Sequence, residues 1–516
     1  MVGTFTWDAS KTTAVSPHHI EAPAIIDTLP ISTQFAERLA VFRLKDVPPE
    51  VVADAKLILL DTLGAMLAAS SPKYSATRIL MDFARRLGGR PESSLVGQKF
   101  KTSCVNAALV NGTLGYYCDI EPHHVGGILH APAVMVPASL AVAEKEGANG
   151  ARFLGAMILG IEVTCRVSYA LNPVALYNRG FHPSAICGAF GAAAAAGHLF
   201  RLSAPKFAIA LGLAMQQASG LLAWASDHTE NSRPFNPGLA ARNGTTAAYL
   251  AHLGFGGPPT PFEGKYDAFT AFSGERHPDA LLADWGRRYY LPEFAYKLYS
   301  SCSFTHPGLD ALLGIAREHN LRSSDVKEII LRFPKSGAHM IDNNELKSHC
   351  AQYILPVGLT FGQVMIDDIL QDRLRHPEVA RLRANTRMIA DPDLDKTYPE
   401  AYASIVEVTT TDDRHLSKRV DHAKGMMQNP LTPEEIHQKY LKLATTVTAV
   451  SHAERIAEAI AQVGRLDTVR TLAAMLRNLV PRKPGRATRT APRPSRAKTA
   501  RARATASRKR GEGKLT

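Results

Sequence analysis

The stretch PSAICGAFGAAAAAGHLF, residues 183–200, decides the fold, because small Ala and Gly side chains dominate it. Small side chains allow helix axes to approach closely, so this stretch predicts a buried helix in a tightly packed helical bundle. Its most apolar part, from Ala185 to Ala196, is too short to cross a bilayer. We therefore expect a core helix here, and no transmembrane segment in the chain.

Helical patterns extend from this stretch in both directions. From residue 33 to about residue 255, apolar residues recur at three- and four-residue steps, as in PPEVVADAKLILLDTLGAMLAAS (48–70). The pattern returns near residue 432, where Thr432 and Glu435 match a capping box. We expect residues 33–290 and 425–480 to form one large all-helical domain built from both ends of the chain.

A different pattern lies between these two helical parts. The segments VKEIILRFP (326–334) and ASIVEVTTT (403–411) alternate in polarity or are β-branched, which predicts strands. Helical stretches surround them, including residues 307–320. The fold class predicted is therefore mainly α with an inserted α+β domain, which we assign to residues 291–424.

The charge of the chain is concentrated at its C-terminal end. Of the 516 residues, 45% are hydrophobic and 21% charged, with a net charge of +13. Residues 481–516 hold thirteen Lys or Arg and one acid, so they carry nearly all of this charge. We predict a disordered basic tail there, either a solvated appendage or a contact for nucleic acid or another polyanion. Residues 1–32 are predicted to be an irregular leader.

Several function classes lose support from missing motifs. The chain has no GxGxxG after a strand, no GxxxxGK[ST], no HExxH and no GxSxG, which disfavours dehydrogenases, P-loop ATPases, zincins and serine hydrolases. Its six cysteines form no CxxC pair and are typical of reduced thiols. The N-terminal stretch lacks a signal-peptide pattern, and we expect a cytoplasmic protein.

The densest polar cluster lies in NGTLGYYCDIEPHHVGGILHAPAVMVPA, residues 111–138. It places two carboxyl groups and three imidazoles between apolar helices: Asp119, Glu121, His123, His124 and His130. Burial of such groups costs free energy unless they form hydrogen bonds or ion pairs, or have a catalytic function. Carboxyl and imidazole groups are suited to proton transfer near neutral pH. The alternatives are a polar surface loop and a His/Asp metal site, although the spacing matches no common ligand pattern.

Three further positions offer an imidazole or a cation. His182 precedes Pro183, near a predicted helix start, where the helix dipole disfavours a proton on the ring and favours a bound anion. Arg233 and Lys297 lie beside predicted turns, where each could hold a substrate carboxylate. Taken singly, such a residue is more often a packing histidine or a surface charge than a site residue.

Together these motifs resemble the MmgE/PrpD family over roughly residues 33–475. The resemblance rests on LLDTLGAMLAAS (59–70), NG…D (111–119), HAPAVMVPASLAVAE (130–144), GFHPSAICGAFGAAAAAG (180–197), NPGLAARNG (236–244), KLYSSC (297–302) and NPLTPEE (429–435). It implies a helical domain, an inserted α+β lid, a homodimer, and neither a metal nor an organic cofactor.

The resemblance also implies roles for single residues. Asp119, His130 and His182 match an active-site aspartate and two active-site histidines, and Lys297 matches a lysine from the lid. Arg233 stands where the family typically has a lysine, and its guanidinium cannot act as a general base. We assign catalysis to four residues: Asp119, His130, His182 and Lys297. Substrate binding is assigned to Arg233, His123 and His124.

The acidic motif departs from the family pattern. Tyr116 replaces a usual histidine, and Glu121, Pro122 and His123 replace Asp-Asp-Thr. These changes alter the pocket and leave the exact substrate open.

Three functional hypotheses follow. The first is elimination of water from a small polycarboxylic acid, as by a 2-methylcitrate dehydratase, with proton transfer by Asp119 and His182. The second is decarboxylation, as of cis-aconitate, at the same site. The third is an inactive family member that binds a partner through its basic tail.

Overall fold

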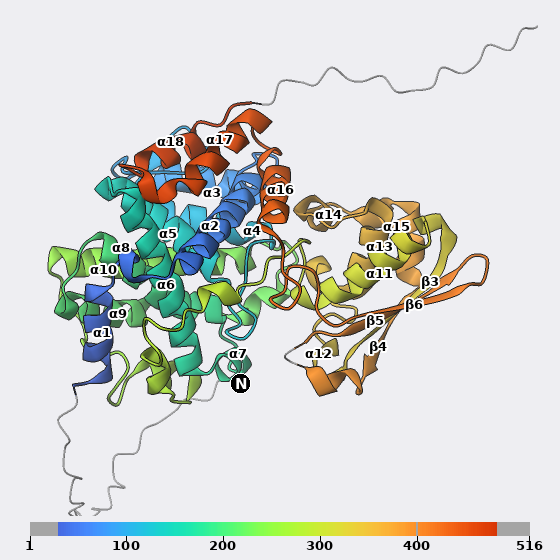
Figure 1. Ribbon diagram of the computed structural model, residues 1–516, viewed down its shortest axis with the longest axis horizontal. Helices are drawn as coiled ribbons and strands as arrows, with labels where there is room; N and C mark the ends of the chain where they lie inside the picture. Colours follow the sequence, from blue (N-terminus) through green and yellow to red (C-terminus); the bar gives the residue numbers. More distant parts are fainter. Residues whose placement is uncertain (1–28, 399–400, 482–516) are drawn as a thin grey trace, which may run out of the picture.

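The computed structural model describes residues 29–398 and 401–481. The predicted fold class is confirmed at its coarse level, because the described chain is mainly α-helical with a smaller α+β part (Figure 1). The predicted leader, except residues 29–32, and the predicted basic tail, except residue 481, lie outside the described residues.

The larger part is built from apolar helices that pack closely. Its N-terminal helices are α1 (Ile31–Val41), α2 (Pro49–Ala69), α3 (Ser75–Leu87), α4 (Cys104–Tyr117), α5 (Ala131–Glu146), α6 (Gly150–Leu171), α7 (Pro173–Asn178), α8 (Pro183–Leu199), α9 (Ala204–Gln217) and α10 (Ser232–Leu253). Helix α8 is the Ala/Gly stretch, and it lies against α5, α6 and α10. Almost all its residues are buried, as predicted.

Glycine permits the closest helix contacts. A Cβ atom at Gly112 of α4 would lie 2.9 Å from the Cα atom of Gly238 of α10. A Cβ atom at Gly244 would overlap the carbonyl oxygen of Ala189 in α8. Helix α10 can therefore lie directly on α4 and α8 only because these positions carry no side chain.

The C-terminal helices return to the N-terminal ones (Figure 1). They are α16 (Pro433–Ala444), α17 (Val450–Ala461) and α18 (Arg470–Arg477). Helix α16 packs on α2, and a buried ion pair joins Lys439 to Asp61 at 2.8 Å. The predicted capping box is present, since Thr432 accepts a hydrogen bond from the Glu435 amide and Glu435 accepts one from the Thr432 amide.

The α+β part holds a four-stranded sheet in the order β4-β3-β5-β6. Its strands are β3 (Val326–Pro334), β4 (Thr386–Asp391), β5 (Ser404–Thr410) and β6 (His415–Val420), and only the β3–β4 pair is parallel. Its helices are α11 (His306–Glu318), α12 (Lys335–Ala338), α13 (Ala351–Phe361), α14 (Ile366–Leu370) and α15 (Pro377–Ala384). A short hairpin, β1 (Ser93–Ser94) with β2 (Lys101–Thr102), lies in the helical part.

Local expectations failed at three places. The helical pattern predicted from residue 33 to about residue 255 is interrupted where α9 ends at Gln217 and Gly220 adopts a left-handed φ of +141°. Arg233 was expected beside a turn, but α10 begins at Ser232 and contains it, because a proline in the first helical turn removes no helical hydrogen bond. Strands β4 and β6 were not predicted from their mixed sequences.

Helix α6 is long and apolar enough to cross a membrane, but 94% of its most apolar window is buried inside the protein. It is therefore a central helix of the core. The six cysteines are all free thiols.

Candidate active site

Four helix ends meet at the polar cluster. Asp119 follows the C-terminal end of α4, and His130 and His182 are the N-cap residues of α5 and α8. Arg233 lies in the first turn of α10. Three helix N-termini thus point their positive dipole ends to one region, which favours negative charge there.

Asp119 is the centre of the cluster. Its Oδ1 accepts a hydrogen bond from Lys297 Nζ at 2.5 Å, and its Oδ2 lies 2.8 Å from Arg233 Nη1. All three side chains are at most 5% exposed. The backbone of Asp119 adopts a left-handed φ of +49°, an uncommon conformation that is a frequent mark of functional sites.

These cations fix the charge of Asp119. Burial alone would raise the pKa of its carboxyl group, but the charges of Arg233 and Lys297 outweigh burial and hold this pKa well below its usual range. Asp119 is therefore ionised at any ordinary pH. It can hold the two cations in place, but it is a poor proton donor.

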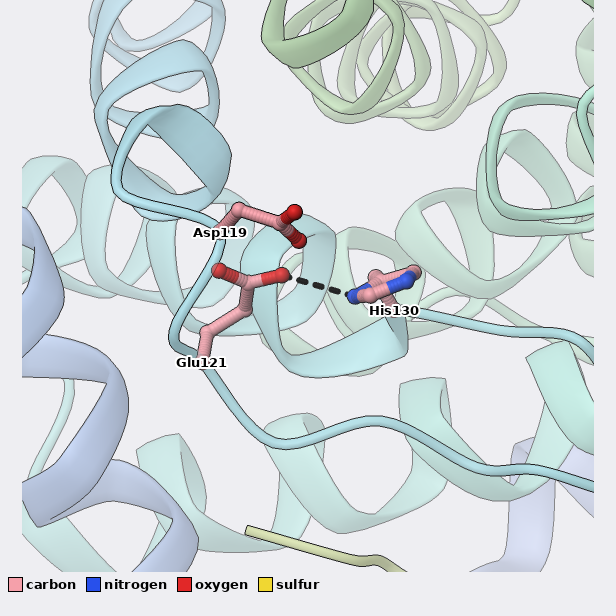
Figure 2. A group of neighbouring side chains, drawn as sticks. All are labelled: Asp119, Glu121 and His130. Atoms are coloured by element: carbon pink, nitrogen blue, oxygen red, sulfur yellow. Dashed lines mark hydrogen bonds and ion pairs between the residues drawn. The ribbon is translucent and has the colours of Figure 1, made fainter. Parts of the chain in front are cut away.

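A second carboxyl group behaves in the opposite way. Burial raises the pKa of Glu121 to about 8, with the positive charge of Lys297 opposing the shift and the negative charge of Asp119 adding to it. Its Oε1 lies 2.7 Å from His130 Nδ1. Figure 2 shows this pair beside the Asp119 carboxylate. Burial, together with the charge of Lys297, holds the pKa of His130 well below its usual value.

His182 belongs to the same cluster through Tyr116. The Tyr116 ring stacks on His182 at a centroid distance of 5.9 Å and contacts the His130 ring at 4.3 Å. Burial, with the positive charge of Arg233 adding to it, lowers the pKa of His182 to about 3. This direction agrees with the prediction from its place at a helix N-terminus.

His123 and His124 have different surroundings. The ring of His123 stacks on His130 at 5.6 Å, and its Nε2 lies 3.0 Å from Ser303 Oγ. Both ring nitrogens of His124 are occupied, one by Glu293 and the other by the amide of Gly127. The structure thus brings His123 to the cluster and leaves His124 no free nitrogen for a substrate.

Three groups around the cluster lack a partner within the described residues. Buried nitrogens without one are Arg233 Nε, His123 Nδ1 and Trp224 Nε1. Trp224 also lies over the Arg233 guanidinium at 5.8 Å and beside His349 at 5.6 Å. Unpaired buried nitrogens are costly, and a polar ligand would satisfy them. Sequence reasoning missed Trp224 and His349, since nothing near them in the chain indicates a site.

The geometry of a metal site is present in part. Ligand atoms of Asp119, Glu121 and His130 lie within 4.8 Å of one another (Figure 2). However, both oxygens of Asp119 already face cations, and a third cation would be repelled by Arg233 and Lys297. The donor set fits an anion better than a metal ion.

The cluster is closed in this structure. Asp119, His182, Arg233 and Lys297 are each less than 5% exposed. A cavity of about 330 Å³ is lined in part by Ile120, Leu298 and Lys439, and none of the predicted site residues lines it.

The fold and the site together define a mainly helical protein with a buried cluster of carboxyl, imidazole and cationic side chains. The chain matches the MmgE/PrpD N-terminal domain over residues 33–281 and the MmgE/PrpD C-terminal domain over residues 299–465. It belongs to the MmgE/PrpD family.

Relatives cover most of the chain at low identity. A cis-aconitate decarboxylase-like protein, oryM, of Aspergillus oryzae is 26% identical over 86% of this chain and 97% of its own length. Human cis-aconitate decarboxylase is 24% identical, over 87% and 95% of the two chains. A probable 2-methylcitrate dehydratase of Saccharomyces cerevisiae is 23% identical, over 67% and 71%. These relatives support a lyase.

Proposed function

We propose that this protein is a lyase that decarboxylates a small polycarboxylic acid of the cis-aconitate type. The observation that carries the proposal is the convergence of Arg233 and Lys297, both buried, on one point. Two such cations can hold two substrate carboxylates or stabilise charge that develops beside one. The helix N-termini of α5 and α8 add to the same field.

The charge states of the site favour decarboxylation over our first hypothesis, dehydration. Elimination of water needs a base strong enough to remove a proton beside a carboxylate. Asp119 is held by two cations, and the pKa of His182 is about 3 because of its burial, so both are weak bases. Decarboxylation needs no such base. The bond to one carboxylate breaks, CO₂ leaves, and the electron pair stays on carbon until a proton arrives.

The proposal assigns roles to four of the predicted residues. Arg233 and Lys297 bind the carboxylates that remain on the substrate. Asp119 contacts both side chains and holds them in position. His130 stands at the edge of the cluster, where it can meet the reacting carbon. We assign no step to His124.

The test is product analysis with purified protein. We would incubate it with cis-aconitate and with 2-methylcitrate, with and without a chelator, and follow products by NMR. Decarboxylation predicts CO₂ and one new C–H bond, which carries deuterium in D₂O. Dehydration of 2-methylcitrate alone would refute the proposal and restore the first hypothesis. Turnover of neither would favour the inactive binding protein.

Variants check the site. Arg233→Gln should raise KM for cis-aconitate by about 10- to 100-fold, since a hydrogen bond to a charged group contributes about 1.5–3 kcal/mol. Arg242→Gln, an exposed arginine on the same helix α10, is the matched control and should change KM by less than twofold. Equal effects of the two substitutions would count against substrate binding at Arg233.

Further expectations from the sequence stay part of this proposal. We propose that residues 291–424 act as a lid that opens to admit substrate, a role favoured by the burial of the cluster. A homodimer is expected, which light scattering would test. Deletion of residues 481–516 should leave turnover unchanged and abolish any salt-dependent binding to polyanions. A cytoplasmic location is expected as well.

A further inference from the structure

The contact between Glu121 and His130 has the form of a proton-sharing pair. Glu121 is fully buried, and the His130 side chain is 15% exposed. Their polar atoms Oε1 and Nδ1 lie 2.7 Å apart, and the other carboxyl oxygen of Glu121, Oε2, accepts a hydrogen bond from the Ile120 amide at 3.0 Å. Within the described residues, His130 Nε2 has no hydrogen-bond partner. This nitrogen is therefore free to meet a ligand.

The surroundings decide where the protons lie. The charged groups that act on the pair are Asp119, Lys297, Arg233 and the Asp61–Lys439 ion pair. The ring of His123 stacks on the His130 ring. With its pKa raised by burial to about 8, Glu121 holds a proton at neutral pH, and His130 is neutral because burial lowers its pKa. Glu121 then donates to Nδ1, and the single N–H proton of the neutral ring sits on Nε2.

The other acidic group of the cluster cannot take this role, because Asp119 is ionised and both its oxygens face cations. His182 is neutral and has no carboxyl partner, since its Nδ1 lies 3.5 Å from the amide of Asn236. Among the predicted residues, only the Glu121–His130 pair thus combines an imidazole N–H that can be donated with a protonated carboxyl group that can replace the proton.

We propose that Glu121 is a positioning residue that makes His130 the proton donor of the reaction, a proposal that rests on the lyase function above. In the step, His130 Nε2 gives its proton to the carbanion carbon and a C–H bond forms. At the same time the proton of Glu121 moves to Nδ1. The imidazole stays neutral, Glu121 becomes a carboxylate beside Lys297, and solvent returns one proton after product release.

Glu121→Gln is the direct test. The amide can still donate to Nδ1, so it keeps the shape and the tautomer, but it has no proton to pass on. We expect kcat to fall by about 10²- to 10⁴-fold, the range for general acid catalysis, with KM changed by less than threefold. Glu121→Asp keeps a carboxyl group, so its kcat should be at least about tenfold higher than that of Glu121→Gln.

The pH profile separates this role from a structural one. A proton donor works only while protonated, so kcat of the native enzyme should fall as pH rises through about 8, the pKa to which burial raises Glu121. This alkaline limb should be absent in Glu121→Gln. Glu162→Gln is the control, because Glu162 is buried, burial raises its pKa to about 7, and its partners are the amides of Tyr290 and Leu291. Glu162→Gln should keep the alkaline limb, and its pH profile should have the same shape as that of the native enzyme.

A spectroscopic readout does not depend on turnover. In full-length protein labelled with ¹⁵N-histidine, with His130 assigned by loss of its signal in His130→Gln, the native ring should switch from the Nε2–H to the Nδ1–H tautomer near pH 8. Glu121→Gln should hold the Nε2–H form throughout. No switch in the native protein, or an unchanged kcat and alkaline limb in Glu121→Gln, would overturn the inference. Inactivity of the native enzyme toward both acids, with the switch present, would overturn only the lyase proposal.

Discussion

Removal of the Lys439 ammonium should destabilise the protein in a pH-dependent way. Lys439 of α16 contacts both oxygens of Asp61 in α2 at 2.8 Å, and the two side chains are 5% and 0% exposed. Lys439 also donates to the Ile120 carbonyl at 2.6 Å, next to Asp119. The substitution Lys439→Met keeps most of the volume and leaves Asp61 buried without a partner. Loss of one member of a buried pair costs roughly 3–5 kcal/mol.

The pH dependence follows from Asp61. Burial raises its pKa from 3.8 to about 6, against the opposing charge of Lys439. An acid whose pKa is raised in the folded state stabilises the fold below the unfolded pKa, and this stabilisation is lost as pH rises through the folded pKa. At pH 5 Asp61 is protonated with or without Lys439. At pH 7 the native protein gains about 1.4 kcal/mol by ionising it, at about 1.36 kcal/mol per pH unit.

The variant cannot make this gain, because without Lys439 the pKa of Asp61 rises further. The free-energy difference between native protein and Lys439→Met should therefore be larger at pH 7 than at pH 5 by about 1.4 kcal/mol. Urea unfolding followed by far-UV circular dichroism measures it, provided that the m-values of the two proteins agree.

Two further variants make the measurement specific. Lys442→Met alters the same helix at an exposed lysine that forms no ion pair within the described residues, and it should cost less than about 1 kcal/mol. The double variant Asp61→Leu with Lys439→Met removes both charges and should recover most of the loss. A loss of Lys439→Met that is equal at pH 5 and pH 7 would refute the reasoning about Asp61.

Three other outcomes are expected. Arg233→Lys keeps the positive charge but loses the planar fork between Asp119 and Glu230, so KM should rise roughly tenfold; an unchanged KM would argue that charge alone suffices. Chelator should leave turnover unaltered, since Asp119 already faces two cations, and loss of activity restored by a divalent ion would contradict this. Gly244→Ala should destabilise the fold by about 3 kcal/mol or more, because its Cβ atom would overlap Ala189 of α8. Thermal unfolding compares it with Gly256→Ala, where a Cβ atom meets nothing within 4 Å.

Local pattern was enough for much of the fold. The Ala/Gly stretch of α8, the capping box at Thr432 and the strands β3 and β5 follow from side-chain size, local hydrogen bonding and polarity alternation, which neighbours in the chain determine. Strand β4 was missed because it is an edge strand with exposed side chains, so its pairing with β3 decides its structure. The turn predicted beside Arg233 was wrong because the two prolines that follow it, Pro234 and Pro237, lie inside helix α10.

The candidate site shows the same division. The sequence by itself determined which residues are candidates for the chemistry, because a carboxylate or imidazole between apolar helices is rare enough to be noticed: Asp119, His130 and His182. It did not determine their charge states. Lys297 reaches Asp119 across 178 positions of the chain, and Lys439 reaches Asp61 across 378. Only the tertiary structure brings these charges together, and charge and burial at close range decide that Asp119 is ionised while Glu121 keeps its proton.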